Sequence, residues 1–336
     1  MATFNNTNNL PAVNQYDANK SIISPLFLGQ DYMQYFDVLP NIKGVTKVDH
    51  LGSLSKISKA FNEGAFSGST GGTFSSVTIT PGRVEAEIEF YANTLFGKMK
   101  GQLMKDNFEF DNIEGTTVKN HLMDLIGQGI KADFNRQLFL GDASQGSADY
   151  NIYSGVFKAA KSASATQITE ADIAAQGGGA ALATGAGVQI LKGLYDAADP
   201  AMLEMGNLVF FVSGDIADDY MATLEGTGYA AAGWGALTNG VPALTWRGIP
   251  IVVRRDWDGV GADVAHIDGC SSAVETHRAV LTTKGAFIVG TDFDETRMEQ
   301  WYSQDNKCFR FRVSYMCGVA LADGKLAVCY TPDAWA

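Results

Sequence analysis

The side chains that could carry out chemistry in this chain are few and widely separated. Metal sites and proton-transfer sites need histidine, cysteine or carboxylate groups that the fold brings together. The four histidines are His50, His121, His266 and His277. No two of them are three or four residues apart, the spacing that would place both on one face of a helix. The sequence therefore predicts ordinary packed or surface histidines and no metal-binding pair.

The cysteines also lack a functional spacing. All four lie in the last quarter of the chain, at positions 270, 308, 317 and 329. None belongs to a Cys-x-x-Cys pair, which is typical of zinc ligands, so no zinc site is indicated. We expect buried free thiols that behave as small apolar side chains.

Carboxylates gather at two places in the C-terminal half. The first group is Asp256, Asp258 and Asp263, and the second is Asp292, Asp294 and Glu295. Acidic residues at alternate positions of a glycine-rich loop can hold calcium, but the spacing does not match the twelve-residue EF-hand loop. A solvated turn is the favoured interpretation of the first group.

Sequence motifs for catalysis are missing as well. The chain has no G-x-S-x-G, H-E-x-x-H or G-x-x-x-x-G-K-[ST] motif. A loose dinucleotide-type pattern at Gly226, Gly228 and Ala231 follows a predicted helix, whereas a dinucleotide site requires a preceding strand. We therefore predict that the protein is not an enzyme and uses no cofactor and no metal.

The composition indicates that part of this protein's surface is covered by other protein molecules. The 336 residues carry a net charge of −12, from 37 acidic and 25 basic residues. This balance argues against a general nucleic-acid binder, which needs a basic surface. Only 18% of the residues are charged, against about 25% in typical domains. No run of about eighteen apolar residues predicts a membrane span, and the N-terminal MATFNNTNNLPAVNQY does not resemble a secretory signal, so we expect a cytosolic chain.

The N-terminal third predicts an arm, a long loop and a strand. Residues 1–20 are rich in asparagine and contain little to bury. Residues 43–76 are polar, glycine- and serine-rich, and dotted with single aromatics; loops of more than about 15 residues are usually functional or disordered. We expect a two-stranded excursion that closes through residues 77–80. The sequence RVEAEIEF at 83–90 alternates strictly, which predicts a half-buried strand with a charged outer face.

The strongest helical pattern covers residues 116–140. Apolar residues recur every four positions, at Val118, Leu122, Ile126, Ile130, Phe134 and Leu138. Met123 and Leu125 are expected to widen this stripe. At about 1.5 Å per residue, the helix would be roughly 37 Å long.

The remaining chain predicts a mixture of helices and strands, and hence an α+β fold. Residues 171–187 are low in complexity, with many alanines and glycines. Helices are expected at 188–197 and 215–224, and strands at 207–213, 246–253, 278–289, 299–302, 309–315 and 326–330.

This order of parts resembles that of the major capsid proteins of tailed bacteriophages, which have the Hong Kong 97-like fold. Several segments carry the resemblance. QLFLGDAS at 137–144 looks like the exit of the family's long helix, and 244–253, with Gly248-Ile249-Pro250, looks like a strand of its axial domain. Residues 278–292, and 305–313 followed by 326–333, resemble the strands that re-enter and close the fold.

The resemblance implies a division of the chain. The expected parts are an N-terminal arm at 1–38, an extension loop at 41–80, a peripheral domain at 81–187 and 273–320 with the spine helix 116–140, and an axial domain at 188–272 and 321–336. The candidate contacts between subunits are then Lys56, Lys59, Phe61, Phe66 and Phe74.

The resemblance also implies a function and partners. The chain would assemble with itself into hexamers and pentamers of an icosahedral virion shell that encloses double-stranded DNA without sequence-specific binding. A separate scaffolding protein, a portal, and decoration or tail-connector proteins would be further partners, with assembly in the bacterial host cytoplasm and no role for a membrane.

Two alternatives stay open. The same fold also serves encapsulins, which are bacterial compartments that hold cargo enzymes. A soluble α/β enzyme that uses the glycine-rich loop 226–240 is the alternative from another class.

Some relatives of phage capsid proteins are cross-linked through lysine and asparagine. Lys56 and Lys59 lie in the corresponding loop, but we find no matching acidic catalyst and favour exposed lysines.

Overall fold

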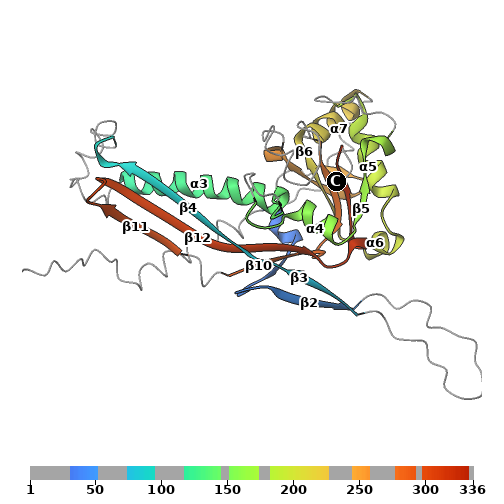
Figure 1. The fold of residues 1–336 in the computed structure, drawn as a ribbon. Coiled ribbons are helices and arrows are strands. Elements are labelled where there is room, and N and C mark those ends of the chain that lie inside the picture. Colours follow the sequence, from blue (N-terminus) through green and yellow to red (C-terminus); the bar gives the residue numbers. More distant parts are fainter. Residues whose placement is uncertain are drawn as a thin grey trace, which may run out of the picture.

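The computed structural model describes residues 31–51, 74–94, 117–144, 151–173, 182–226, 244–257, 277–292 and 297–332. Strands and helices both contribute, which confirms the α+β class. Two larger sheets, one long and one compact, organise these elements, and a two-stranded hairpin leaves the long sheet (Figure 1).

The long sheet is built on β12 (Cys308–Leu321). One edge of β12 pairs antiparallel with β4 (Gly82–Tyr91) along the full length of β4. The other edge pairs with β11 (Arg297–Ser303) and, further along, with β10 (Phe287–Thr291). β1 (Asp37–Leu39) adds to β10 in parallel. The predicted alternating strand is therefore confirmed as β4.

Helix α3 (Thr117–Leu140) follows the long strands β4 and β12 (Figure 1). Its buried stripe consists of Leu122, Ile126, Ile130, Phe134 and Leu138, which confirms the predicted helix and its period. The ring of Phe134 meets that of Tyr315 on β12 edge-on, with 6.1 Å between centroids. The expectation that Leu125 widens the stripe is wrong, because this side chain is 48% exposed.

Short elements close the same core at the end of α3. They are the 3-10 helix η1 (Asp31–Tyr35) and helix α4 (Val156–Ser162). The rings of Tyr32 and Phe36 meet that of Phe139 in edge contacts, with 5.6 and 5.9 Å between centroids. This packing anchors the last part of the predicted N-terminal arm, 1–38, to the end of α3.

The hairpin consists of β2 (Thr46–Leu51) and β3 (Phe74–Ile79), paired antiparallel from Thr46↔Ile79 to Leu51↔Phe74. It points away from α3 (Figure 1). Its base packs on the long sheet through Ile42, Ile79 and Ile288. The predicted two-stranded excursion is confirmed for these strands, while residues 52–73 lie outside the described part.

The compact sheet has six strands in the order β5-β13-β9-β6-β8-β7. Their bounds are β5 Thr166–Ile168, β13 Ala327–Tyr330, β9 Ala279–Thr283, β6 Leu208–Ser213, β8 Ile249–Arg254 and β7 Thr245–Trp246. Its helices are α5 Ala186–Asp196, α6 Pro200–Met205 and α7 Gly214–Gly226. Short 3-10 turns are η2 Glu170–Asp172, η4 Arg255–Trp257 and η6 Gly324–Leu326. Apolar side chains of α5 and α7, such as Ile190, Leu194 and Ile216, form a second core with this sheet.

Two expected strands differ from the structure. The single strand expected at 278–289 is two strands, β9 and β10, which belong to different sheets and are separated by a turn at Lys284 and Gly285. The strand expected at 246–253 is interrupted by a turn at Arg247 and Gly248. Both β5 and β9 pair into the six-stranded sheet, although the expected division gives their segments to the peripheral domain.

Candidate functional site

The charged face of the long sheet is the first candidate site. Strand alternation turns Val84 of β4 into the core and Glu85, Glu87 and Glu89 outward. On the paired strand β12, Phe309 and Phe311 are buried, while the alternating Arg310 and Arg312 face outward with the glutamates. The predicted charged outer face is therefore confirmed.

Arginines of β12 bridge these glutamates. Arg312 Nε lies 2.8 Å from Glu85 Oε1, and its Nη2 donates to Glu87 Oε1 at 2.5 Å. Arg310 Nε lies 2.6 Å from Glu89 Oε1. The hydrogen bond to Glu87 contributes most to raising the pKa of Arg312 above its ordinary value. Since these pairs are open to solvent, we expect them to orient the side chains more than they stabilise the fold.

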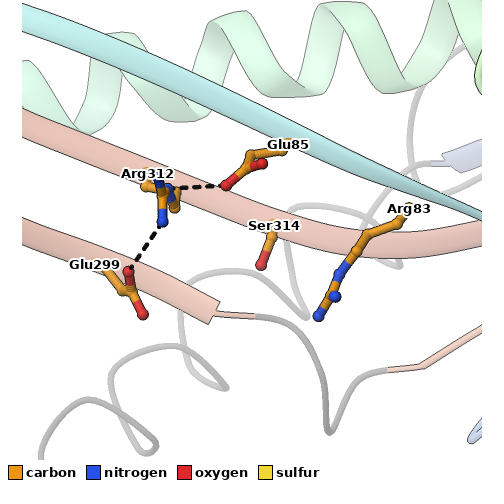
Figure 2. Close-up of a pocket in the computed structure, with 5 residues that line it drawn as sticks. All are labelled: Arg83, Glu85, Glu299, Arg312 and Ser314. Carbon is orange, nitrogen blue, oxygen red and sulfur yellow. Dashed lines mark ion pairs between the residues drawn. The ribbon is translucent and has the colours of Figure 1, made fainter.

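A hollow of about 210 Å³ lies in this face, lined by Arg83, Glu85, Glu299, Arg312 and Ser314 (Figure 2). Glu299 comes from β11, and its Oε2 lies 4.0 Å from Arg312 Nη1. A general acid or base must be aimed at a substrate, whereas Glu85 and Glu299 both engage the guanidinium of Arg312. Mixed charges that are already paired suit a surface that meets another protein better than a catalytic site.

A groove of about 550 Å³, lined by both apolar and acidic side chains, lies between β4 and α3. Ile88, Leu125 and Ile152 line it and remain partly or largely exposed. Within the described residues, β4 pairs only with β12, so the edge of β4 beside the groove has no strand partner. Unpaired strand edges next to apolar side chains are typical of contact surfaces.

The GDAS turn that follows α3 is a buried polar lock. The Asp142 side chain is fully buried, and Lys158 Nζ of α4 donates to its Oδ2 at 2.8 Å. Ser144 donates to Oδ1 from its backbone N–H at 2.8 Å and from its hydroxyl at 2.6 Å. Burial raises the pKa of Asp142, but the hydrogen bonds from Lys158 and Ser144 outweigh it and hold the pKa below its ordinary value. The turn therefore fixes α3 to α4.

A second polar contact joins the six-stranded sheet to the core around the end of α3. The guanidinium carbon of Arg254, at the end of β8, lies 4.2 Å from the ring centroid of Tyr32 and 4.8 Å from that of Phe139. Its Nη2 donates to Asp256 at 2.7 Å. Asp256 thus serves an ion pair, while Asp258 and Asp263 lie outside the described residues.

Groups suited to catalysis or metal binding do not converge in the part of the chain that the structure describes. No three histidine, cysteine or acidic side chains cluster there as metal ligands. The buried His277 lies close to the half-buried Asp215, with 2.6 Å between Nδ1 and Oδ2. This pair was not predicted, because the two residues are far apart in sequence and only the fold brings them together. None of the described helices has the length and apolar character of a bilayer-spanning helix.

The cysteines behave as expected where they are described. Cys308, Cys317 and Cys329 are buried free thiols, and burial raises the pKa of Cys317 to about 12. Such a thiol is not a nucleophile at neutral pH. Cys270 lies outside the described residues.

The candidate contact residues of the extension loop are largely beyond the described part. Lys56, Lys59, Phe61 and Phe66 fall outside it. Phe74 is the first residue of β3 and pairs with Leu51 at the far end of the hairpin. The structure therefore places the hairpin but does not bring these side chains into a site, and their role stays a prediction.

Comparison with known proteins gives a clear result only at the level of structure. No protein-family model matches the sequence, and no curated protein matches it. A chain of the satellite phage P4 procapsid, which includes the size determination (Sid) protein, is 10% identical with a TM-score of 0.56, over 93% of this chain and 98% of that chain.

Two further solved structures extend this likeness. A chain of the Gordonia phage Cozz structure is 13% identical with a TM-score of 0.57, over 89% of this chain and 85% of that chain. A chain of the capsid of an empty GTA particle is 12% identical with a TM-score of 0.50, over 90% and 89%. At such low identity, the likeness shows a shared fold.

Proposed function

From the Hong Kong 97-like capsid fold of this chain, we propose that it is a major capsid protein that assembles with copies of itself into an icosahedral phage shell. The observation that carries the proposal is the extent of the likeness, which covers 93% of this chain and 98% of the P4 procapsid chain. The fold shared with that procapsid chain therefore takes in nearly all of the residues of this chain.

The geometry of the described residues supports self-assembly. A hairpin projects from the body (Figure 1), and a charged sheet face carries paired arginines and glutamates (Figure 2). A groove lies beside the edge of β4 that has no strand partner among the described residues. Shell subunits need several contact surfaces of this kind on one molecule, because each copy must meet different neighbours. We propose pentamers and hexamers as the building units; a GTA capsid computed with C5 symmetry is compatible with five-fold positions in a shell of this fold.

We assign the parts of the chain accordingly. Residues 1–38 are the N-terminal arm, 41–80 the extension loop, 81–187 and 273–320 the peripheral domain, and 188–272 and 321–336 the axial domain. The six-stranded sheet of the axial domain also recruits β5 and β9 from the peripheral segments. In this assignment, the hairpin β2–β3 is the stem of the extension loop.

The shell would enclose double-stranded DNA without reading its sequence. A net charge of −12 is compatible with a shell that does not attract DNA electrostatically over its whole inner surface. We also propose a scaffolding protein, a portal, and decoration or tail-connector proteins as partners, with assembly in the host cytoplasm and a final place in the virion.

Removal of the loop beyond the hairpin tests this function. A deletion of residues 55–72 should leave folded, soluble subunits that fail to close shells, because the loop would no longer reach a neighbour. The matched control replaces 55–72 with a glycine-serine linker of equal length, which keeps the reach but removes Lys56, Lys59, Phe61 and Phe66. Electron microscopy of particles gives the readout. Normal shells from the deletion would contradict the loop assignment.

A further inference from the structure

A hollow of about 460 Å³ lies at one end of the six-stranded sheet. Three tight turns surround it: one before β6 at Asn207, one between β7 and β8 at Arg247, and one between β9 and β10 at Lys284. The Lys284 N–H donates to the carbonyl of Asn207 at 3.0 Å, which ties two of these turns together. Tyr35 of η1 completes the wall, and the N–H of Gly285 donates to its carbonyl at 2.8 Å.

Arg247 is held in a defined position at the rim of this hollow. Its guanidinium carbon lies 4.4 Å from the ring centroid of Trp246 and 5.0 Å from that of Tyr195. The residue is exposed and makes no hydrogen bond or ion pair with any described residue. Arg310 and Arg312, in contrast, are each paired with glutamates. A guanidinium fixed by aromatic stacking, with its donors free, is prepared to bind an anion.

The other donors of the hollow fit the same kind of ligand. Lys284 is an exposed second cation, and it too has no ion-pair partner among the described residues. The exposed amide of Asn207 and the phenol of Tyr35 add neutral donors; burial raises the pKa of Tyr35, which therefore keeps its proton. None of the described residues that line the hollow is acidic. Arginine, lysine, asparagine and tyrosine are the side chains that typically contact DNA phosphates.

We propose that this hollow binds a phosphate group of the enclosed DNA backbone, so that the Arg247 end of the six-stranded sheet faces the inside of the shell. The inference rests on the proposed capsid function. One phosphate site in a chain of net charge −12 would give weak, sequence-independent contact. Repetition over many copies would arrange the outer layer of DNA without immobilising it.

The test measures duplex binding by the full-length chain as salt is varied. Fluorescence anisotropy of a fluorescein-labelled duplex compares the wild type with the double variant Arg247→Gln and Lys284→Gln. The control variant, Lys192→Gln and Lys325→Gln, removes the same charge at two exposed lysines outside the hollow. Each lost phosphate contact reduces the slope of log K against log salt by about 0.9. Since Arg247 and Lys284 share one phosphate in this proposal, the hollow variant should lose about 0.9 from this slope. The control variant should keep the wild-type slope. A duplex of different sequence should give the same slope for each of the three proteins, because the contact is to the backbone.

Each other outcome overturns the inference. Equal losses for the two double variants would mean diffuse attraction, and no duplex binding by the wild type would mean no site. A titration with inorganic phosphate at constant ionic strength distinguishes free phosphate from a DNA phosphate as the ligand of the hollow. Saturation by free phosphate without duplex binding would exclude the DNA backbone as the ligand. Electron microscopy of the same samples reports assembly independently. Loss of shells in the hollow variant with unchanged duplex binding would indicate a neighbour's carboxylate as the ligand. Absence of shells from the wild type, also with a scaffolding protein or crowding agent added, would instead contradict the capsid function.

Discussion

Gly290 of β10 and Gly318 of β12 face each other across the antiparallel ladder, and the base of the hairpin packs over both. A Cβ atom at position 290 would lie 2.5 Å from Cδ1 of Ile42, and one at 318 would lie 2.9 Å from Cα of Pro81. The absence of both side chains lets the hairpin cross the long sheet at close range. Since this hairpin carries the proposed extension loop, the two glycines set the direction in which the loop leaves the subunit.

The substitution Gly318→Ala tests this relationship. The new methyl group would meet the backbone of Thr80 and Pro81, so the hairpin must shift. Overpacking of this kind costs about 1–3 kcal/mol. We expect a folded subunit with a lower urea midpoint and with malformed or missing shells in electron microscopy.

Gly44→Ala is the matched control, because a Cβ there meets no atom within 4 Å and the residue lies at the same end of the hairpin. It should leave both the urea midpoint and the shells unchanged. If Gly318→Ala gives normal shells at the wild-type yield, the hairpin does not need this close crossing.

A second glycine substitution should have the opposite effect on stability. Gly129 lies in the exposed part of α3, and a Cβ there also meets no atom within 4 Å. Alanine in a helix interior is more stable than glycine by about 0.5–1 kcal/mol. We therefore expect Gly129→Ala to increase the free energy of unfolding by this amount in urea titrations. A decrease would show that the helix needs the glycine for a bend or a close contact.

The Asp142 lock predicts a dependence of stability on pH. The folded-state pKa of Asp142 lies below its ordinary value, so its ion pair stabilises the fold above about pH 4. This contribution is lost as the pH falls through the lowered folded-state pKa. Lys158→Met removes the partner of a buried carboxylate and should lower the free energy of unfolding at pH 7 by about 1.5–3 kcal/mol.

The difference between wild type and Lys158→Met should shrink in acid, because protonated Asp142 no longer needs the ammonium group. Urea titrations at a series of pH values measure this difference. Lys158→Arg should restore part of the stability, while Lys192→Met on the exposed face of α5 should change little. A gap between wild type and Lys158→Met that stays constant down to the lowest pH would assign the effect to packing and not to charge.

Elements with one buried face and one solvated face are predicted well from the sequence. Val84 in β4 and Leu122 in α3 belong to regular patterns because one face of each element is buried and the other is solvated. The turn at Lys284 and Gly285 was missed for the opposite reason. β9 and β10 are buried at every position, so residues on both sides of the turn form one continuous apolar pattern.

The hollow beside Arg247 could not be predicted from sequence at all. Asn207, Arg247 and Lys284 are ordinary polar residues at turns, separated by tens of residues. Only the order of strands β9, β6 and β8 in the sheet brings their turns to one end. The candidate contacts Lys56 and Phe61, in contrast, were proposed from family resemblance and still await a structural test.

The central claim is that copies of this chain build a closed shell, and electron microscopy of the purified full-length protein, with its mass from light scattering, tests it most directly. The account predicts closed shells, or rings of five and six subunits, with masses that are multiples of the 35.9 kDa chain. The measurement is repeated with added scaffolding protein and with a crowding agent, because assembly can require either of them. A chain that stays monomeric under all these conditions would contradict the account.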